Sequence, residues 1–415
     1  MRRLALLVAV TLLASPAIAG GRPQGIGCSW PATLDSFNLA YPDTSADYWM
    51  THFGAVPASK LVIRGGYPQA RYFSFHAYDE AQRPVASIAD EDIRPDRGSN
   101  PFVDADGRAG TYTVDVVFEA PPEDPEPNTV YAGEMENGGR NPAGWVIYRI
   151  YIPDDRKDRT GGVPLPEVTL VTADGNIELP LEPCSHEPPP VGDEIDRRIA
   201  EESYPLDGER HVPGTYDPPV WKRFYGTDRE FRDWCGDYGH QCDQGPKMTS
   251  GFLANQQIAY LYARISREFG DVVVVRLKPP TFPDTRAGEE PSAARDVRYW
   301  SLCQNNDATQ RVVECAADHE TVVGTGGYAT FAISDPEDRP RNATRAHGVN
   351  WLPWGGAYYT GVLIYRHMLP ARGFDPAIQR IPEGTDPGDA MRGYLPDARY
   401  CTTTRFERTG PAGCA

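Results

Sequence analysis

The feature of this sequence that most constrains its fold is a series of short apolar stretches that occurs twice in the same order. The matched stretches share β-branched or aromatic residues, and several carry an arginine at the same place. The pairs are LVIRG (61–65) with VVVRL (273–277), RYFSFHAYD (71–79) with RYWSLCQNN (298–306), TYTVDVVF (111–118) with YATFAIS (328–334), and VIYRIYIPD (146–154) with VLIYRHMLP (362–370). A matched series in the same order predicts a tandem duplication.

A stretch with helix-like spacing precedes the first matched strand of each copy. These stretches cover residues 43–53 and 251–269, and the second carries Ile258, Tyr262 and Ile265 at helical intervals. We therefore expect a short helix to open each copy.

The matched stretches have the length and composition of β-strands. They are short, alternating or aromatic, and Gly, Pro, Asn and Asp separate them. This pattern favours an all-β fold with minor helices, arranged as two tandem antiparallel β-sandwich or jelly-roll-like domains. The expected segments are a signal peptide (1–19), a first sandwich (20–184), a structured linker with a helix and a small disulfide loop (185–248), a second sandwich (249–382) and a disulfide-closed tail (383–415).

The start of the chain has the layout of a secretory signal. Arg2 and Arg3 precede an apolar run, which ends in the small residues around Ala19. The run is shorter than the roughly 20 residues that a membrane span needs, so cleavage near Ala19 is favoured over an N-terminal anchor. No later stretch is apolar enough to span a bilayer. The sequence therefore predicts a secreted or periplasmic protein.

Eight cysteines follow the predicted signal, and an even number in an exported chain indicates disulfides. One pair brackets the first copy, and the other six cysteines fall into three close pairs. The predicted disulfides are Cys28–Cys184, Cys235–Cys242, Cys303–Cys315 and Cys401–Cys414. The chain has no CxxC pair, and its histidines do not lie near cysteines at ligand spacing, so we expect no metal of the zinc type.

Charge and motifs narrow the possible partners. The formal net charge of -17 argues against nucleic acid or anionic lipid as the main partner. Catalytic and nucleotide-binding motifs occur in no context that supports them, so no cofactor is predicted. The acidic residues between 90 and 106 allow two interpretations. Solvated acids in turns are the favoured one, because the closing Glu of a calcium loop is missing, and a calcium site is the alternative. These residues are Asp90, Glu91, Asp92, Asp96, Asp104 and Asp106.

Residues that occur in both copies are expected to serve the fold. The matched strand arginines are Arg64 with Arg276, Arg71 with Arg298, and Arg149 with Arg366, and a strand arginine commonly pairs with a carboxylate. A loop found in one copy is freer to have a function. The loop at residues 347–359 carries aromatic rings that could stack on a sugar or lipid, although packing in a core is the competing interpretation. The candidate ligand-binding residues are His347, Asn350, Trp351, Trp354, Tyr358 and Arg366.

Several of these motifs resemble an uncharacterised bacterial β-sandwich family, a domain of unknown function. The second copy carries the resemblance in Tyr299 to Leu302, in Asn350 to Pro353 and in Tyr365 with Arg366. The first copy matches more loosely and lacks the NWLP element. Its matching residues are Phe73, Ser74, Phe75, Tyr78, Asp79, Tyr148, Arg149, Tyr151 and Pro153. The resemblance implies a jelly-roll-like fold and no established activity.

Two functional hypotheses follow. The first is an exported binding or envelope-associated module, with a small-molecule, sugar or lipid ligand between the two copies, because domain interfaces favour binding sites. The alternative is a secreted carbohydrate or ester hydrolase on a jelly-roll scaffold, in which His347 or His319 acts with an acidic side chain. An enzyme would bring a histidine or an acid pair into a concave site, whereas a binding module would present aromatic rings.

Overall fold

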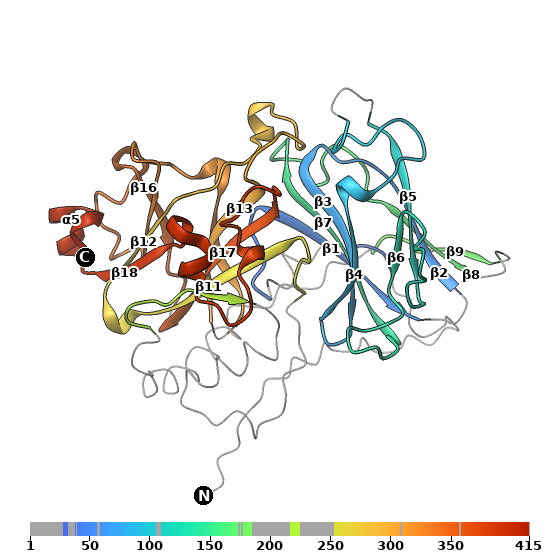
Figure 1. Cartoon of the computed structure of the whole chain (residues 1–415), viewed down its shortest axis with the longest axis horizontal. Coiled ribbons are helices and arrows are strands. Elements are labelled where there is room, and N and C mark those ends of the chain that lie inside the picture. The colour runs from blue at the N-terminus through green and yellow to red at the C-terminus, as the bar shows by residue number, and fades with distance from the viewer. Residues whose placement is uncertain are drawn as a thin grey trace, which may run out of the picture.

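The computed structural model describes residues 28–31, 38, 40–55, 59–104, 109–172, 175, 177–184, 216–224, 253–307, 309–356 and 358–414. The predicted signal peptide and most of the predicted linker, with its helix and its Cys235–Cys242 pair, lie outside the described residues. Within the described ranges the protein is all-β, with several sheets and short helices, as the sequence predicts (Figure 1).

The first half of the chain forms two sheets. One sheet has the strand order β1-β7-β3-β4, and the other has the order β6-β5-β2-β8-β9. The strands are β1 (Ala46–Gly54), β2 (Ser59–Gly66), β3 (Ala70–Asp79), β4 (Pro84–Ala89), β5 (Thr111–Val117), β6 (Thr129–Tyr131), β7 (Ala143–Pro153), β8 (Glu167–Thr172) and β9 (Glu178–Pro180).

The second half forms two more sheets, with the orders β10-β11-β17-β13-β14 and β16-β15-β12-β18. The strands are β10 (Lys222–Phe224), β11 (Ile258–Ser266), β12 (Val272–Leu277), β13 (Val297–Asn306), β14 (Val312–Ala317), β15 (Ala329–Ser334), β16 (Val349–Pro353), β17 (Thr360–Pro370) and β18 (Asp397–Cys401). The helices of the described residues are short. They are α4 (Pro387–Met391), α5 (Thr403–Thr409) and the 3-10 turns η1 (Asp90–Asp92), η3 (Arg267–Phe269), η4 (Thr285–Ala287), η5 (Asp318–Glu320), η6 (Arg345–His347), η7 (Ile378–Arg380), η8 (Arg392–Tyr394) and η9 (Pro411–Cys414).

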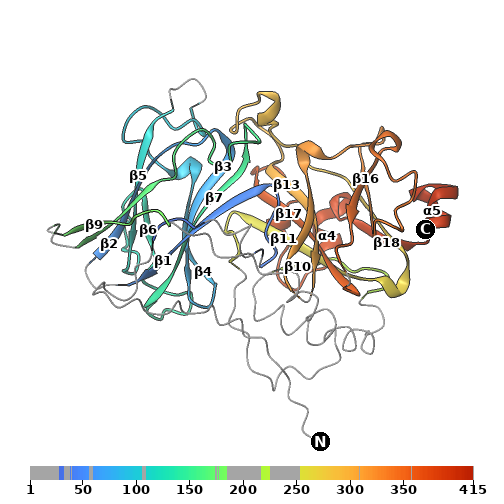
Figure 2. The same ribbon diagram turned by 180° about the vertical axis from the view of Figure 1, so that it is seen from behind.

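The two halves share one strand order. The series β1-β7-β3-β4 corresponds to β11-β17-β13-β14, and β6-β5-β2-β8 corresponds to β16-β15-β12-β18. Even the exceptional parallel pair recurs, as β5 with β6 and as β15 with β16. Figures 1 and 2 show the two pairs of sheets side by side, with β3 and β7 of the first half next to β13 and β17 of the second.

Each half has its own apolar core between its two sheets. Phe73 and Phe75 of β3 lie in the first core, and Trp300 and Leu302 of β13 lie in the second. Every residue of β3 and of β13 is buried, because the other face of each strand is covered as well. Strands buried on both faces lose the alternation of apolar and polar residues that marks a half-exposed strand.

The expected opening helices are wrong, because both stretches form strands. Residues 46–53 of the first stretch belong to β1, and residues 258–266 of the second form β11. In β11, Ile258 faces the first half, whereas Leu261 and Ile265 face the core of the second half. Burial on both faces spreads apolar residues over positions that also satisfy a helical period, so the period could not distinguish the two structures.

Three of the four predicted disulfides are present, namely Cys28–Cys184, Cys303–Cys315 and Cys401–Cys414. Cys303 and Cys315 occupy directly opposite positions on β13 and β14. Residues 397–401, expected in a separate tail, form β18 and pair with β12. Among the described residues, no helix has the length and hydropathy needed to cross a membrane.

Gly144 offers a test of the close approach between β7 and β3. A Cβ atom at this position would lie 1.8 Å from the carbonyl oxygen of Tyr78, and backbone cannot yield as a flexible side chain can. We expect Gly144→Ala to lower the free energy of unfolding by about 1–3 kcal/mol, as overpacking does. Gly54→Ala is the control, because a Cβ atom there has no neighbour within 4 Å. Equal urea midpoints for the two variants would contradict this packing.

Candidate functional site

The two halves meet in a buried layer of side chains that we call the seam. It lies between the sheet β1-β7-β3-β4 and the sheet that contains β11, β17, β13 and β14. Its apolar part is rich in tyrosine, and the rings of Tyr151 and Tyr299 meet across it with 5.3 Å between centroids. The buried apolar residues of the seam are Ala46, Tyr48, Tyr72, Tyr78, Ala89, Ile147, Tyr151, Ile152, Ile258, Tyr299, Ala317 and Met368.

Among the ion pairs that cross the seam, two correspond to each other and run in opposite directions. Nη1 of Arg71 on β3 lies 2.5 Å from Oδ1 of Asp318 on η5, and both side chains are fully buried. In the matching pair, Nη1 of Arg298 on β13 lies 3.3 Å from Oδ1 of Asp90 on η1. Each half therefore supplies one arginine and one carboxylate to the other half.

Each carboxylate is also held by the backbone of its own half. Oδ2 of Asp318 accepts a hydrogen bond from the N–H of Trp300 at 3.1 Å, and Oδ2 of Asp90 accepts one from the N–H of Phe73 at 3.0 Å. Burial raises the pKa of Asp90 to about 6, and Arg298 opposes that shift. These bonds orient both acids from within their own half.

Two short segments cross the seam as well. Residues 41–45 precede β1 but lie against the second half, where the Tyr41 carbonyl accepts a hydrogen bond from Nη2 of Arg366 at 2.6 Å. Residues 253–257 precede β11 but lie against the first half, where the Leu253 carbonyl accepts one from Nη2 of Arg149 at 2.7 Å. Tyr41 and Leu253 both have positive φ angles, 53° and 50°, so the two segments turn alike.

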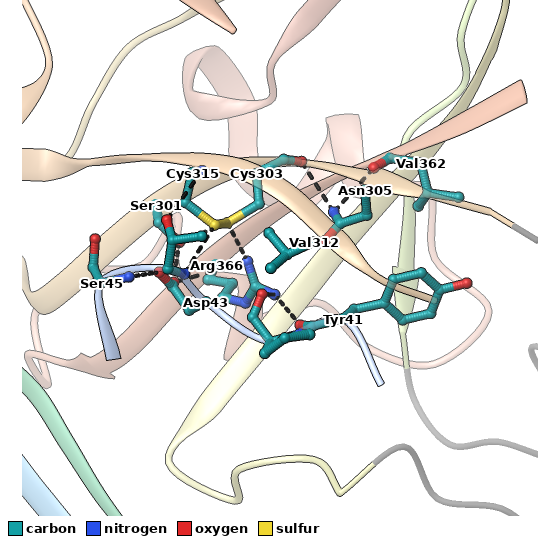
Figure 3. Close-up of a disulfide and its surroundings, with 12 residues drawn as sticks. Tyr41, Asp43, Ser45, Ser301, Cys303, Asn305, Val312, Cys315, Val362 and Arg366 are labelled. Carbon is teal, nitrogen blue, oxygen red and sulfur yellow. Dashed lines mark hydrogen bonds and ion pairs between the residues drawn. A yellow bond between two sulfur atoms is a disulfide. The ribbon is translucent and has the colours of Figure 1, made fainter. Parts of the chain in front are cut away.

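Residues 41–45 cover β13 and β17, and polar side chains gather under them (Figure 3). We call this group the second polar cluster, because it lies on the second half. It consists of Asp43, Ser301, Cys303, Cys315 and Arg366. Nη1 of Arg366 lies 2.7 Å from Sγ of Cys303, and Nη1 also lies 3.8 Å from Oδ2 of Asp43. That carboxylate accepts hydrogen bonds from the hydroxyls of Tyr299 at 2.9 Å and Ser301 at 2.7 Å.

The second polar cluster has the residue types of a metal site. Asp43, Cys303 and Cys315 offer ligand atoms that lie within 4.8 Å of one another. The two sulfur atoms are joined in a disulfide, however, so neither is the thiolate that binds a metal. In this state the cluster serves to hold residues 41–45 on the second half.

The first polar cluster occupies the matching place on the first half and consists of Ser74, His76, Ser87, Arg149 and Asn255. His76 and Ser87 are paired on β3 and β4 in the register that Cys303 and Cys315 have on β13 and β14. Asn255 occupies the position in residues 253–257 that Asp43 occupies in residues 41–45. The two clusters therefore share a frame and differ in chemistry.

The candidate residues of the 347–359 loop are separated by the structure. His347 is exposed on η6, with Nδ1 2.8 Å from the hydroxyl of Thr344. Asn350 is buried, and its amide is fully used by backbone groups. Its Nδ2 donates to the carbonyls of Val322 and Thr330, and its Oδ1 accepts from the N–H of Val322.

The two tryptophans of this loop face different surroundings. Trp351 is partly exposed, packs on the outer side of the sheet beside Phe406, and has the guanidinium of Arg339 4.4 Å from its ring centroid. Trp354 lies in the core of the second half, where its Nε1 donates to the carbonyl of Tyr358. Arg366 lies at the seam, on the face of β17 opposite that core.

His319, a candidate base of the hydrolase hypothesis, has partners at both ring nitrogens. Nδ1 lies 3.4 Å from Oδ1 of Asp318, and Nε2 lies 2.7 Å from Nη1 of Arg286. An arginine can only donate, so Nε2 is the acceptor in this contact. The lone pair that a general base needs is therefore already engaged.

The acidic run between residues 90 and 106 does not act as one group. Asp90 belongs to the seam, Glu91 lies 2.9 Å from Nη2 of Arg298, and Asp96 accepts a hydrogen bond from Thr113. Asp106 lies outside the described residues. A calcium site in this run stays a prediction.

The sequence missed the acids that complete the seam. Its expectation that matched arginines pair with carboxylates holds for Arg71, Arg298 and Arg366, but Arg64 and Arg276 are exposed on their strands. Asp318 and Asp90 come from the copy opposite their arginines, and Asp43 comes from the segment before β1. One signal was available, because Asp90 and Asp318 directly follow the corresponding edge strands β4 and β14.

The chain matches no family model and no curated protein sequence. Among solved structures it is similar to an uncharacterised protein from Burkholderia cenocepacia, with 13% identity, a TM-score of 0.47, and coverage of 92% of this chain and 82% of that one. It is also similar to a protein from Vibrio parahaemolyticus, with 12% identity, a TM-score of 0.39, and coverage of 87% and 90%. The resemblance to a domain of unknown function stays a prediction.

The crossing ion pairs lead to a stability prediction. Asp318→Asn removes the charge that compensates Arg71 while keeping an oxygen for the N–H of Trp300. Arg71 then keeps only Asp284, 3.8 Å from its Nη2, as a charged partner. Because the buried guanidinium loses its closest counter-charge, we expect the free energy of unfolding to fall by an amount near the lower end of about 3–5 kcal/mol. Glu407→Gln is the control, since its partner Arg341 is 90% exposed and the pair is screened by water. Similar urea unfolding curves for the two variants would refute the role of the seam pair.

A buried histidine adds a pH dependence. His367 lies on β17 toward the core, its Nδ1 accepts from the N–H of Ile378 at 3.3 Å, and its Nε2 has no partner among the described residues. Burial lowers the pKa of this imidazole to about 3. The unfolded chain, with a pKa of about 6.5, therefore binds a proton that the folded chain does not bind between these values.

The resulting stability is complete above about pH 6.5 and declines as the pH falls toward 3. We expect His367→Gln to reduce the slope of the free energy of unfolding against pH by up to about 1.4 kcal/mol per unit between pH 6 and 4. Urea unfolding at a series of pH values measures this slope. His347→Gln, at an exposed position, is the control, and equal slopes for both variants and the parent would rule out the effect.

Proposed function

We propose that this protein is an exported, disulfide-stabilised binding module of the bacterial cell envelope, built by duplication of one β-sandwich unit. The observation that carries the proposal is the seam, where a buried arginine of each half pairs with a buried aspartate of the other half. Such pairs fix two units as one rigid scaffold. The repeated strand order supports duplication, and the three disulfides fit an oxidising compartment.

We infer that the ligand binds on the outer surface beside the edge strand β16. A seam filled with buried side chains favours this outer surface over the space between the copies. Trp351 is partly exposed there, with Arg339 stacked on its ring, and His347 is exposed on the preceding turn. An indole face with a nearby guanidinium suits a saccharide of the cell wall, since such rings combine apolar stacking with polar contacts.

A secreted hydrolase remains the competing function, and the geometry of His319 favours it less. The imidazole lies beside Asp318, as in many catalytic pairs, but Arg286 occupies the nitrogen that would take a proton. The same Asp318 compensates Arg71, so the acid already has a structural role.

The test is a thermal-shift screen of the oxidised protein against cell-wall saccharides, lipids and calcium. We expect a saccharide to raise the melting temperature of the parent with the logarithm of its concentration relative to Kd, and to leave that of Trp351→Ala unchanged. Ile177→Ala is the control, because its side chain is 51% exposed on the first half. Equal shifts in Trp351→Ala and the parent, or turnover of an ester or glycoside that His319→Asn abolishes, would overturn the proposal.

A further inference from the structure

The two polar clusters of the seam differ in charge although their backbones match. The N–H of Asp43 donates to the hydroxyl of Tyr48 at 2.9 Å, and the N–H of Asn255 donates to that of Tyr260 at 3.0 Å. Oδ1 of each residue accepts from the N–H two positions later, at 2.9 Å in both cases. A neutral amide thus occupies the place of a carboxylate.

This difference leaves Arg149 without the compensation that Arg366 has. Arg149 is 3% exposed, its Nη2 donates to the Leu253 carbonyl, and the rings of Tyr48 and Tyr78 lie 5.6 and 5.4 Å from its guanidinium carbon. Among the described residues no carboxylate pairs with it, and its Nη1 has no hydrogen-bond partner. A buried charge without a counter-charge is costly, so a compensating group is expected.

Other polar groups lie beside this guanidinium. Ser74 is paired with Arg149 in the register of β3 and β7, and its Oγ interacts with the side chain of Tyr72 without forming a hydrogen bond of good geometry. The buried His76, two positions along β3, interacts with the side chain of Gln257, but neither ring nitrogen forms a hydrogen bond of good geometry. Burial lowers the pKa of His76 well below its usual range, and Arg149 lowers it further, so the neutral ring offers one N–H donor.

The orientation of Asn255 adds another donor. Its Oδ1 is fixed by the N–H of Gln257, so Nδ2 takes the place that Oδ2 of Asp43 has in the second polar cluster. There, Oδ2 accepts from Ser301 and lies near Arg366. In the first polar cluster the same place holds an amide N–H, which donates toward the hydroxyl of Tyr72 at 3.5 Å. The position that corresponds to Oδ2 of Asp43 therefore has hydrogen-bond donors around it and no carboxylate oxygen to accept from them.

We propose that the first polar cluster binds a small monovalent anion, held by Nη1 of Arg149, Oγ of Ser74 and the N–H of His76. One negative charge compensates one guanidinium, as Asp43 does for Arg366. The anion must be small, because Tyr72, Tyr78 and Leu253 all contact residues of the buried cluster. A halide meets both requirements, and this site is independent of the proposed ligand surface on β16.

The first experiment is urea unfolding in chloride and in gluconate at equal ionic strength. For the parent, the folding equilibrium constant should rise about tenfold for each tenfold increase in chloride above Kd. Asn255→Asp provides the missing carboxylate, so this variant should fold without chloride and show no chloride dependence. Asn137→Asp makes the same charge change at an exposed position and should respond to chloride as the parent does.

The second experiment locates the anion in crystals of the parent grown with bromide. An anomalous peak between Arg149 and Ser74, absent from Asn255→Asp, is the expected result. Two results would overturn the proposal. One is the same stability of the parent in chloride and gluconate. The other is density for water alone in the cluster, and this result decides the question even where Asn255→Asp does not fold.

Discussion

The structure depends on the reciprocal exchange of buried charges across the seam. Arg71 and Arg298 each reach a carboxylate of the other half, and each carboxylate is oriented by a backbone N–H of its own half. Separation of the halves would expose the apolar, tyrosine-rich faces of the seam to water, which is unfavourable. While the seam is closed, each buried charge needs its partner, because loss of one member leaves the other uncompensated.

The sequence predicted the parts of the fold that depend on local patterns. Short strands, the strand arginines and the three described disulfides all follow from residue type and spacing. It failed where burial on both faces removes the local pattern, as in β11. It also could not place Trp351 and Trp354, since one packs outside the sheet and the other inside the core. Separation along the chain does not reveal which side of a sheet a residue takes at the end of a strand.

The acids of the seam show a second limit. Asp90 and Asp318 lie among other acidic residues, and nothing near them in the sequence distinguishes a buried partner from a solvated turn. Their partners come from the other half, so the relevant information is the docking of two sheets. What the sequence does contain is the correspondence of positions, and the same correspondence reveals that Asn255 departs from Asp43. Comparison of the two halves of one chain can therefore locate an unusual site.

The crossing segments also govern how the chain is assembled during synthesis. Arg366 donates to the carbonyl of Tyr41 across a separation of 325 residues, so residues 41–45 cannot dock on the second half until residue 366 has been made. At about 5–20 residues per second, that interval lasts roughly 15–65 seconds. A tyrosine-rich sheet face is open throughout this time. A second nascent chain offers the same face and the same segment, so exchange of segments between two copies is the misassembly to which this architecture is most prone.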